Sequence, residues 1–356
     1  MKQFKLQHLF IGIALASILA SCHKDKINPG QDKPTAEERA GLYVLDQGNL
    51  GKPNSALTYY DYATKKLVPD AFSTANSKGL GNTANDLKIY GSKMYIVVDV
   101  SGTVEVVNPK TAKSIKQVLF QTADKKSREP RSIAFYKGNA YISLYDNNVA
   151  VLDTATLTVS KYIPVGRNPE QLAVSNGKLY VANGGGLSYP DVDKTVSVID
   201  LTSATVTKTL TVGVNPYAVS VDSYGDVFVH AYNIYPAKPT LTIIDSKTDQ
   251  VKSTADFDGG PFSISGDNAY YIASDGTIKI YNVKTAAISA ANLAPAGTTF
   301  TNAYAIAVDP LTNEVFVTDA KDFNSNGLIY AFDKTGKNEY SLVTGINPGS
   351  IAFVNK

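Results

Sequence analysis

Side chains that could carry out redox, metal-dependent or nucleophilic chemistry are scarce in this chain of 356 residues. It contains one cysteine and three histidines, which are His8, His23 and His230. One cysteine can form neither an intrachain disulfide nor a cysteine-based zinc or iron–sulfur site. Because His8 and His23 precede the part of the chain that we expect to fold, a multi-histidine metal site is excluded. We interpret His230 as a polar loop residue, since no Gly-x-Ser-x-Gly motif accompanies it.

Acidic residues offer two further kinds of chemistry. Paired carboxylates could act as general acid and base, and four fall in predicted loops: Asp46, Asp146, Asp191 and Asp319. The run Asp322-x-Asn324-x-Asn326-Gly327, with Asp333 twelfth, matches the start of a calcium loop. Asn-Gly pairs are also typical of hairpin turns, and Asp333 falls at an expected strand end. We therefore predict no catalytic residue, cofactor or metal site, and a hydrolase or lyase ranks third among the function classes.

The composition indicates a soluble globular fold, with 44% hydrophobic and 19% charged residues. There are 34 basic and 32 acidic residues. Two of the lysines, Lys2 and Lys5, lie in an expected leader, and its removal leaves 32 of each sign. This balance excludes the positive charge typical of nucleic-acid-binding proteins.

The leader is predicted from Lys2, Lys5 and an apolar run at residues 9–20. Twelve residues are too few to span a bilayer, which takes about 20, but they suit a signal peptide. The run ends in Leu19-Ala20-Ser21-Cys22, which resembles a bacterial lipobox. That resemblance implies a signal peptide at residues 1–21 and lipidation of Cys22. We accordingly expect an outer-membrane protein held by its lipid anchor at the cell surface.

Residues 22–40 are predicted to form a flexible tether. They contain eight charged residues and two prolines and show no apolar periodicity. The remaining residues, 41–356, are expected to form one folded domain, and we expect a monomer.

This domain is predicted from a repeat of short strands separated by turns. A unit of the type Pro-x-x-Ile/Leu-Ala-Val, followed by Gly-x-x-Tyr-Val, recurs every 39 to 47 residues. Blades of four-stranded propellers have periods of about 40–45 residues. The unit begins at seven positions: Ala84, Pro130, Pro169, Pro216, Pro261, Ala303 and Pro348.

A second marker gives the same count. The third strand of each unit is expected to end in Asp or Asn, residues that form tight turns with the following backbone. These seven residues are Asp61, Asn108, Asp153, Asp200, Asp245, Asn282 and Asp333. The sequence therefore predicts an all-β, seven-bladed β-propeller with four antiparallel strands in each blade.

The two ends of the repeat predict how the ring closes. The last unit supplies only a first strand, at Ser350-Ile-Ala-Phe-Val354, and the first unit opens with a second strand, at Leu42-Tyr-Val-Leu45. We expect the C-terminal strand to pair with the N-terminal blade, which removes two exposed edges.

These motifs, across residues 41–356, resemble the YncE-like seven-bladed propellers. Leu45-Asp-Gln-Gly-Asn49, Glu129-Pro-Arg131 and Asp319-Ala-Lys-Asp322 further resemble a subset found as lipoproteins of Gram-negative bacteria. That subset includes the BtuG-type proteins. The resemblance implies capture of cobalamin outside the cell and transfer to a TonB-dependent transporter. A propeller motif is specific for the fold and weakly specific for the ligand.

The loops that precede each first strand should surround one mouth of the central channel. The repeated motif around the unit start is similar in every unit, but the residue directly after the unit start varies. These seven residues are Asn85, Arg131, Glu170, Tyr217, Phe262, Tyr304 and Gly349. Variation on a rigid frame is typical of a ligand-binding face, although the same residues could simply line a solvated channel.

Long loops after the second strands of blades 1, 4, 5 and 7 are rich in Tyr, Asn and Gly. Tyrosine provides a large contact area at low entropic cost, so these loops suit a flat, amide-rich ligand such as a corrinoid. A protein-interaction scaffold ranks second, and a glycan-binding accessory is also considered, although the chain lacks tryptophan. If the ligand is cobalamin, as the resemblance implies, we expect ligand contacts, with Arg131 on its phosphate, at eight residues: Arg131, Asn183, Tyr189, Tyr217, Tyr232, Tyr235, Tyr304 and Asp319.

Overall fold

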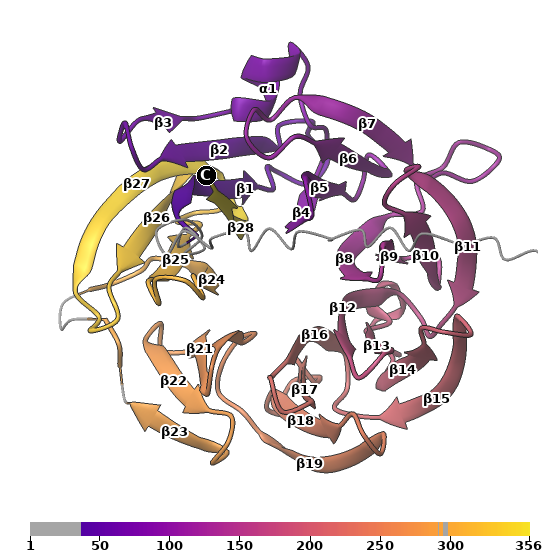
Figure 1. Ribbon diagram of the computed structural model, residues 1–356. Coiled ribbons are helices and arrows are strands. Elements are labelled where there is room, and N and C mark those ends of the chain that lie inside the picture. The colour runs from indigo at the N-terminus through magenta and orange to yellow at the C-terminus, as the bar shows by residue number, and fades with distance from the viewer. Residues whose placement is uncertain (1–36, 291, 295–297) are drawn as a thin grey trace, which may run out of the picture. The chain divides into compact units, whose positions relative to one another are not determined.

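The computed structural model describes residues 37–290, 292–294 and 298–356. The predicted leader, Cys22 and residues 22–36 of the predicted tether lie outside the described residues. The described chain forms seven four-stranded antiparallel sheets arranged as the blades of a ring (Figure 1). The predicted seven-bladed β-propeller is therefore confirmed.

Blades 1 to 4 contain the following strands, in order from the centre of the ring outward. Blade 1 contains β28 (Pro348–Asn355), β1 (Arg39–Asp46), β2 (Ala56–Asp61) and β3 (Leu67–Val68). Blade 2 contains β4 (Ala84–Tyr90), β5 (Lys93–Val98), β6 (Thr103–Val107) and β7 (Ser114–Leu119). Blade 3 contains β8 (Pro130–Tyr136), β9 (Asn139–Leu144), β10 (Asn148–Asp153) and β11 (Thr158–Pro164). Blade 4 contains β12 (Pro169–Ser175), β13 (Lys178–Asn183), β14 (Thr195–Asp200) and β15 (Thr205–Thr211).

Blades 5 to 7 follow the same order. Blade 5 contains β16 (Pro216–Val221), β17 (Asp226–Ala231), β18 (Thr240–Asp245) and β19 (Gln250–Asp256). Blade 6 contains β20 (Ser263–Ser265), β21 (Asn268–Ile272), β22 (Ile278–Asn282) and β23 (Ala287–Ala290). Blade 7 contains β24 (Ala303–Val308), β25 (Val315–Asp319), β26 (Asn326–Phe332) and β27 (Asn338–Ile346). Six of the seven innermost strands start at the predicted unit start, and β20 starts two residues after Pro261.

The apolar core lies between neighbouring blades. Second and third strands such as β5 and β6 are buried along almost their whole length, while outer strands such as β19 are exposed. Within the described residues, seven clusters of buried side chains each join two adjacent blades. Strands that are covered on both faces explain why the second-strand motifs are almost continuously apolar rather than alternating.

Blade 1 departs from the regular pattern at its outer edge. Its outermost strand, β3, has two residues and is followed by the helix α1 (Ala71–Asn76). Asp70 caps α1 by accepting a hydrogen bond from the backbone N–H of Ser73, and Phe72 is buried against the strands of blades 1 and 2. The sequence pattern does not predict this helix, because six residues are too few for a helical period to be visible.

Closure of the ring is confirmed in blade 1. Strand β28 pairs with β1 from Pro348 opposite Asp46 to Asn355 opposite Arg39. Arg39 then links the blade to its neighbour, because its guanidinium binds the buried carboxylate of Asp309 at 2.6 Å.

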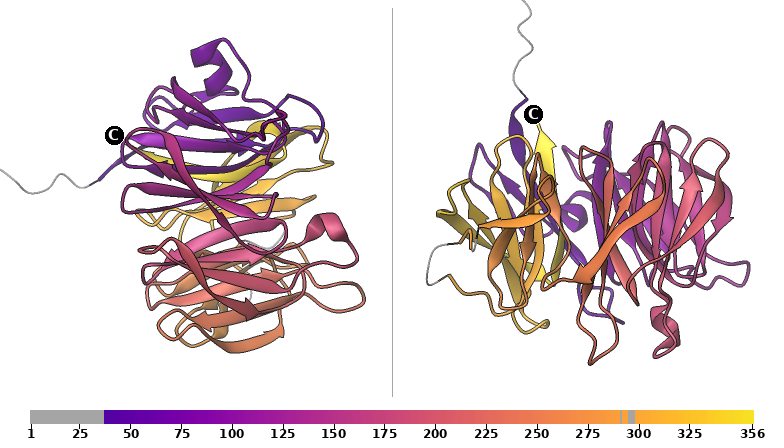
Figure 2. Two further views of the ribbon diagram at one scale, coloured as in Figure 1. Left: turned by 90° about the vertical axis from the view of Figure 1, so that its right-hand side faces the viewer. Right: turned by 90° about the horizontal axis from the view of Figure 1, so that it is seen from below.

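The register of this pair also defines the two faces of the ring. We call the side at Pro348 and Asp46 the mouth face and the side at Arg39 and Asn355 the base face. Glu38 and Lys356, which flank the β28–β1 pair, lie on the base face, where the Lys356 N–H bonds the Glu38 carbonyl at 2.9 Å. The loop with the short 3-10 helix at Gly186–Ser188 projects on the opposite side (Figure 2).

The predicted turns at the ends of the third strands are present on the base face. Asp61, Asp153, Asp200 and Asn282 each accept a hydrogen bond from the backbone N–H three residues later, at 2.7–2.9 Å. These bonds to the charged form lower the pKa of the three aspartates below the ordinary value.

Lysines on three outer strands connect successive blades. Lys116 of blade 2 donates to the Leu157 carbonyl of blade 3. Lys161 of blade 3 donates to Ala204 of blade 4, and Lys208 of blade 4 donates to Asp249 of blade 5. We call these contacts the lysine latches. The equivalent register position in blade 5 is Ser253, so the series stops before blade 6.

Candidate functional site

The mouth face contains a cavity of about 1010 Å³ at the centre of the ring. All seven variable residues that follow the unit starts line it, one from each blade: Asn85, Arg131, Glu170, Tyr217, Phe262, Tyr304 and Gly349. The sequence therefore predicted correctly which residues converge.

A β-bulge explains why these side chains reach the cavity. In every blade except blade 6 the pairing of the innermost strand shifts register directly after its first residue. In blade 3, Pro130 pairs with Leu144 but Ile133 pairs with Ile142, so Arg131 has no partner opposite it. A bulge turns the extra residue away from the ladder. The same bulge thus places one residue of each of these six blades at the mouth, and blade 6 lacks it.

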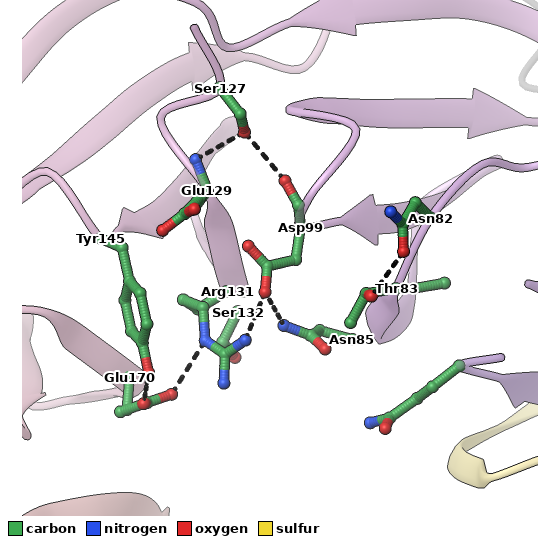
Figure 3. A network of polar contacts seen from close by, with 12 residues as sticks. Asn82, Thr83, Asn85, Asp99, Ser127, Glu129, Arg131, Ser132, Tyr145 and Glu170 are labelled. Carbon is green, nitrogen blue, oxygen red and sulfur yellow. Dashed lines mark hydrogen bonds and ion pairs between the residues drawn. The ribbon is translucent and has the colours of Figure 1, made fainter. Parts of the chain in front are cut away.

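One side of the cavity is a charged network around Arg131 (Figure 3). The guanidinium bonds the Asp99 carboxylate at 2.5 Å and the Glu170 carboxylate at 3.0 Å. It also lies 4.5 Å from the centre of the Tyr145 ring, whose hydroxyl donates to Glu170. Burial lowers the pKa of Arg131, but Glu170, Tyr145 and Asp99 raise it by more, so the guanidinium stays charged.

This network surrounds the residue for which a contact with a ligand phosphate is predicted. Two carboxylates already neutralise the guanidinium, and its aromatic neighbour Tyr145 covers one face. The network as a whole carries net negative charge, which opposes an anionic group. Arg131 lines the mouth as predicted, and its contact with a ligand phosphate stays a prediction.

The opposite side of the cavity is aromatic. The rings of Tyr217 and Tyr232 stack with centroids 3.7 Å apart and planes within 10° of parallel. Tyr232 is 54% exposed, so this pair offers a flat face to the mouth. Tyr304 completes the side; its hydroxyl donates to Gln47 at 2.7 Å, and it meets Phe323 edge-to-face.

Four of the eight predicted ligand residues do not line the cavity. Tyr189 and Tyr235 lie at loop tips, where they are 68% and 92% exposed. Asn183 is a correction, because it is fully buried and its amide donates to Thr195 and Ser197. Asp319 is a second correction.

Asp319 is buried and holds a loop in place instead of facing solvent. Its carboxylate accepts hydrogen bonds from the backbone N–H groups of Thr301, Asn302 and Lys321, at 2.8–2.9 Å. The side chains of Asn183 and Asp319 thus satisfy the protein's own polar groups, and neither has an accessible surface for a ligand.

His230 is also placed differently from the prediction. It lies within β17, is buried, and contacts the rings of Phe257 and Phe262 at the boundary between blades 5 and 6. Neither ring nitrogen has a hydrogen-bond partner within the described residues. Burial without a partner lowers the pKa of His230 to about 3, so it is neutral at pH 7.

The remaining acidic candidates have structural roles. Asp46 is buried and accepts a hydrogen bond from Thr58, and burial raises its pKa to about 7. Asp146 and Asp191 pair with Arg128 and Arg167. The Asp322 carboxylate accepts bonds from the N–H groups of Asn324 and Ser325, as in a turn. Strand β26 separates Asp322 from Asp333, so these two cannot close a single calcium loop.

A second ring of residues, which sequence reasoning missed, supports the mouth. Each of these residues comes directly after the second-strand residue that pairs with the first residue of a unit. Four of them contact side chains of the mouth: Gln47, Asp99, Tyr145 and Tyr232. Their signal is present in the sequence, since they occupy one fixed position of the repeat. Only Tyr232 was predicted, because its loop is long and rich in tyrosine.

Comparison with known proteins places the chain in a family. Residues 40–344 match the family described as domain of unknown function DUF5074. No curated protein matches the chain. No helix within the described residues has the length and apolar character needed to cross a membrane.

Several solved structures share the fold at low identity. A quinonprotein alcohol dehydrogenase-like protein from Bacteroides thetaiotaomicron is 17% identical, with a TM-score of 0.64 over 90% of this chain and 79% of that one. A functionally unknown protein from Desulfotomaculum acetoxidans is 14% identical, with a TM-score of 0.65 over 88% and 98%. Hydrazine synthase of Kuenenia stuttgartiensis is 14% identical, with a TM-score of 0.62 over 77% and 95%. At these identities the likeness concerns the fold alone, and the family match carries the assignment: the chain belongs to the DUF5074 family and folds as a seven-bladed β-propeller.

Proposed function

We propose that this protein is a non-enzymatic capture module whose mouth cavity binds a small-molecule ligand, with a corrinoid such as cobalamin as the first candidate. The observation that carries the proposal is the convergence of one variable residue from every blade on a single cavity. A regular frame that displays different side chains is typical of a surface adapted to a ligand.

The size and composition of the cavity favour a large ligand with a flat face. About 1010 Å³ lies at the upper end of the usual range for small-molecule sites, roughly 300–1,000 Å³. The Tyr217–Tyr232 pair can stack on a planar group, and Asn85, Gln47 and Gln171 offer amides around the wall. These groups complement a ligand that carries many carboxamides.

The position of the chain ends supports the proposed anchoring. Strand β1 begins on the base face, at Arg39, so a tether from a lipidated Cys22 would join the propeller opposite the mouth. A flexible tether attached at the base face would leave the mouth face unobstructed. This arrangement suits capture at the cell surface and transfer to an outer-membrane TonB-dependent transporter, as in the YncE-like and BtuG-type proteins that the sequence resembles.

A protein-interaction scaffold is the second candidate, because apolar side chains are exposed at the tips of the long loops. Leu187, Tyr189 and Tyr235 are 70%, 68% and 92% exposed on the mouth face. Exposed aromatic tips are typical of contacts with a macromolecule. The scaffold predicts stable co-purification with a membrane partner that is abolished by substituting these three residues, while substitutions inside the cavity have no effect.

The proposal is tested by mixing the purified protein with cyanocobalamin and measuring corrin absorbance after size exclusion. We expect near one-to-one co-elution, and we expect Tyr217→Ala to weaken binding at least tenfold, because it removes half of the stacked face. Asp245→Asn is the matched control, since Asn108 and Asn282 occupy the equivalent base-face turn in other blades. Absence of bound corrinoid at tens of micromolar would reject this ligand.

A further inference from the structure

The mouth cavity extends to one side, over blades 6 and 7. More than half of its lining residues come from three segments of these two blades: residues 258–262, 272–276 and 300–307. We call this extension the side arm. Every other blade contributes two to four residues.

Truncation of the innermost strand of blade 6 creates the side arm. Strand β20 has three residues, whereas the other innermost strands have six to eight. The segment before it, residues 258–262, makes one backbone bond to its neighbour, from the Gly260 N–H to the Ile272 carbonyl at 2.8 Å. The turn between β21 and β22 is also tight, closed by a bond from the Gly276 N–H to the Ala273 carbonyl. With a short innermost strand and a short turn after β21, blade 6 does not close the cavity on its side.

The inner surface of the side arm is apolar. Phe262, Ile272, Phe300 and Ile306 line it, and their side chains also pack into the cores beside blade 6. Tyr304 also lines this part of the cavity. Such a surface suits an apolar or aromatic group of a ligand.

The outer end of the side arm is acidic. Asp258 is exposed and makes no hydrogen bond or ion pair with any described residue. Asp275 accepts a hydrogen bond from Thr277 and forms an ion pair with Lys279 at 3.9 Å.

No free positive charge balances these carboxylates on the described part of the cavity wall. The charged residues of the wall are Asp86, Glu170, Asp258 and Asp275 against Arg131 alone. Arg131 is shared between Asp99 and Glu170. Lys88 pairs with Asp86 and Lys279 pairs with Asp275, so Asp258 is the carboxylate of the wall that has no cationic partner among the described residues. The wall therefore carries net negative charge, which attracts cations and opposes anions in a partly enclosed space.

We infer that the side arm is a subsite for a cationic group, such as an ammonium, carried on an apolar or flat part of the ligand. The apolar part contacts Phe262 and Phe300, and the cation reaches Asp258 and Asp275. The inference rests on the proposed function in one respect, which is that the mouth is a ligand site. It adds the sign of the charge that the ligand carries, and it names blade 6 as the blade whose carboxylates bind that charge.

The inference is tested with two flat tricyclic dyes of similar size and opposite charge, cationic methylene blue and anionic resorufin, at pH 7.5. Binding to the full-length protein is measured by visible absorbance titration in 20 mM and 500 mM salt. We expect methylene blue to bind at least tenfold more tightly than resorufin in low salt, with a smaller difference in high salt, because salt screens exposed charges.

The double variant Asp258→Asn, Asp275→Asn locates the effect. It should weaken methylene blue binding at least fivefold and leave resorufin binding unchanged or stronger, since the shape of the side arm is retained. Asp245→Asn removes one charge on the base face and should change neither titration. Melting curves of all variants serve to show that they are folded.

The outcomes separate this inference from the proposed function. Equal or tighter binding of resorufin, or methylene blue binding that the double variant does not weaken, overturns the cationic subsite while the cyanocobalamin experiment stands. Failure of cyanocobalamin together with charge-selective dye binding in the side arm rejects the corrinoid and supports a cationic ligand. Failure of all three compounds to bind overturns both proposals.

Discussion

Blades 2 to 5 and blade 6 are built from the same repeat but differ in how completely it is realised. In blades 2 to 5 the innermost strands have six or seven residues, and lysine latches join each blade to the next. In blade 6 the innermost strand has three residues, and Ser253 stands where a latch from blade 5 would begin. The complete blades form a closed wall of the mouth, whereas the incomplete blade opens the side arm. We therefore expect ligand selectivity to depend most on blade 6, the blade that departs most from the repeat.

The largest effect is expected from deleting residues 348–356, which removes β28 from blade 1. This exposes the edge of β1 and uncovers apolar side chains such as Ala352 and Val354. The melting temperature should fall by well over 10 °C, measured by calorimetry, because a whole strand and its contacts with two blades are lost. Both regions should melt together. Truncation of Lys356 alone is the control, and an unchanged melting temperature after the full deletion would refute closure of the ring.

Acid should act first at the boundary between blades 5 and 6, through His230. Its pKa is lowered from 6.5 to about 3 by burial, so the folded state is favoured above pH 6.5 and loses stability as the pH falls toward 3. The loss approaches about 1.4 kcal/mol for each pH unit. Protonation of Asp46, whose pKa is raised to about 7, acts in the opposite direction over the same pH range. His230→Phe removes the histidine contribution, so the variant should lose less stability than the natural protein, or gain some, in urea unfolding measured from pH 7 to pH 4. Parallel slopes for the variant and the natural protein would assign the acid sensitivity to other groups.

A smaller effect is expected from breaking a latch among the regular blades. Lys161→Met keeps most of the side chain but loses the bond to the Ala204 carbonyl, 2.7 Å long. An exposed bond to a charged donor contributes about 1 kcal/mol, so the melting temperature should fall by about 2 °C. Lys247→Met, in the exposed β18–β19 turn, is the matched control. Equal melting temperatures for the two variants would show that the latches do not stabilise the ring.

The smallest effect should come from adding the missing latch. Ser253 occupies the position of Lys161 and Lys208 in the register of the outer strand. Ser253→Lys can place an ammonium near the carbonyl of Ala286, which shares the left-handed backbone conformation of Ala204. We expect the melting temperature to rise by about 1 °C and amide exchange in blade 6 to slow. Faster exchange there would mean that the difference between the two regions has another origin.

Much of the mouth could be predicted from the sequence, but its pairings could not. The seven variable positions were identified because each follows a repeated unit start. The partners of Arg131 are Asp99 and Glu170, 32 and 39 residues away along the chain and in two other blades. Nothing in the local pattern indicates that these three side chains meet. The sequence therefore placed Arg131 at the mouth without indicating that its charge is paired there.

The burial of polar residues at the ends of second strands could not be predicted from the sequence either. Asn183 and Asp319 were assigned to loops because polar residues are typical of loops. Each is instead the last residue of a second strand, where it is buried and makes hydrogen bonds within the protein. His230 was misplaced similarly, since a lone histidine next to a loop carries no sign of the aromatic cluster that encloses it.

The sequence by itself determined the number of blades, their strands and the closure of the ring, because these follow from local periodicity and from turn residues repeated seven times. Only the tertiary structure decided which side chains are available to a ligand. That availability depends on charge pairing and burial between blades, and residues far apart in the chain supply both. The truncation of β20 likewise becomes a side arm only when blades 5 and 7 stand beside it.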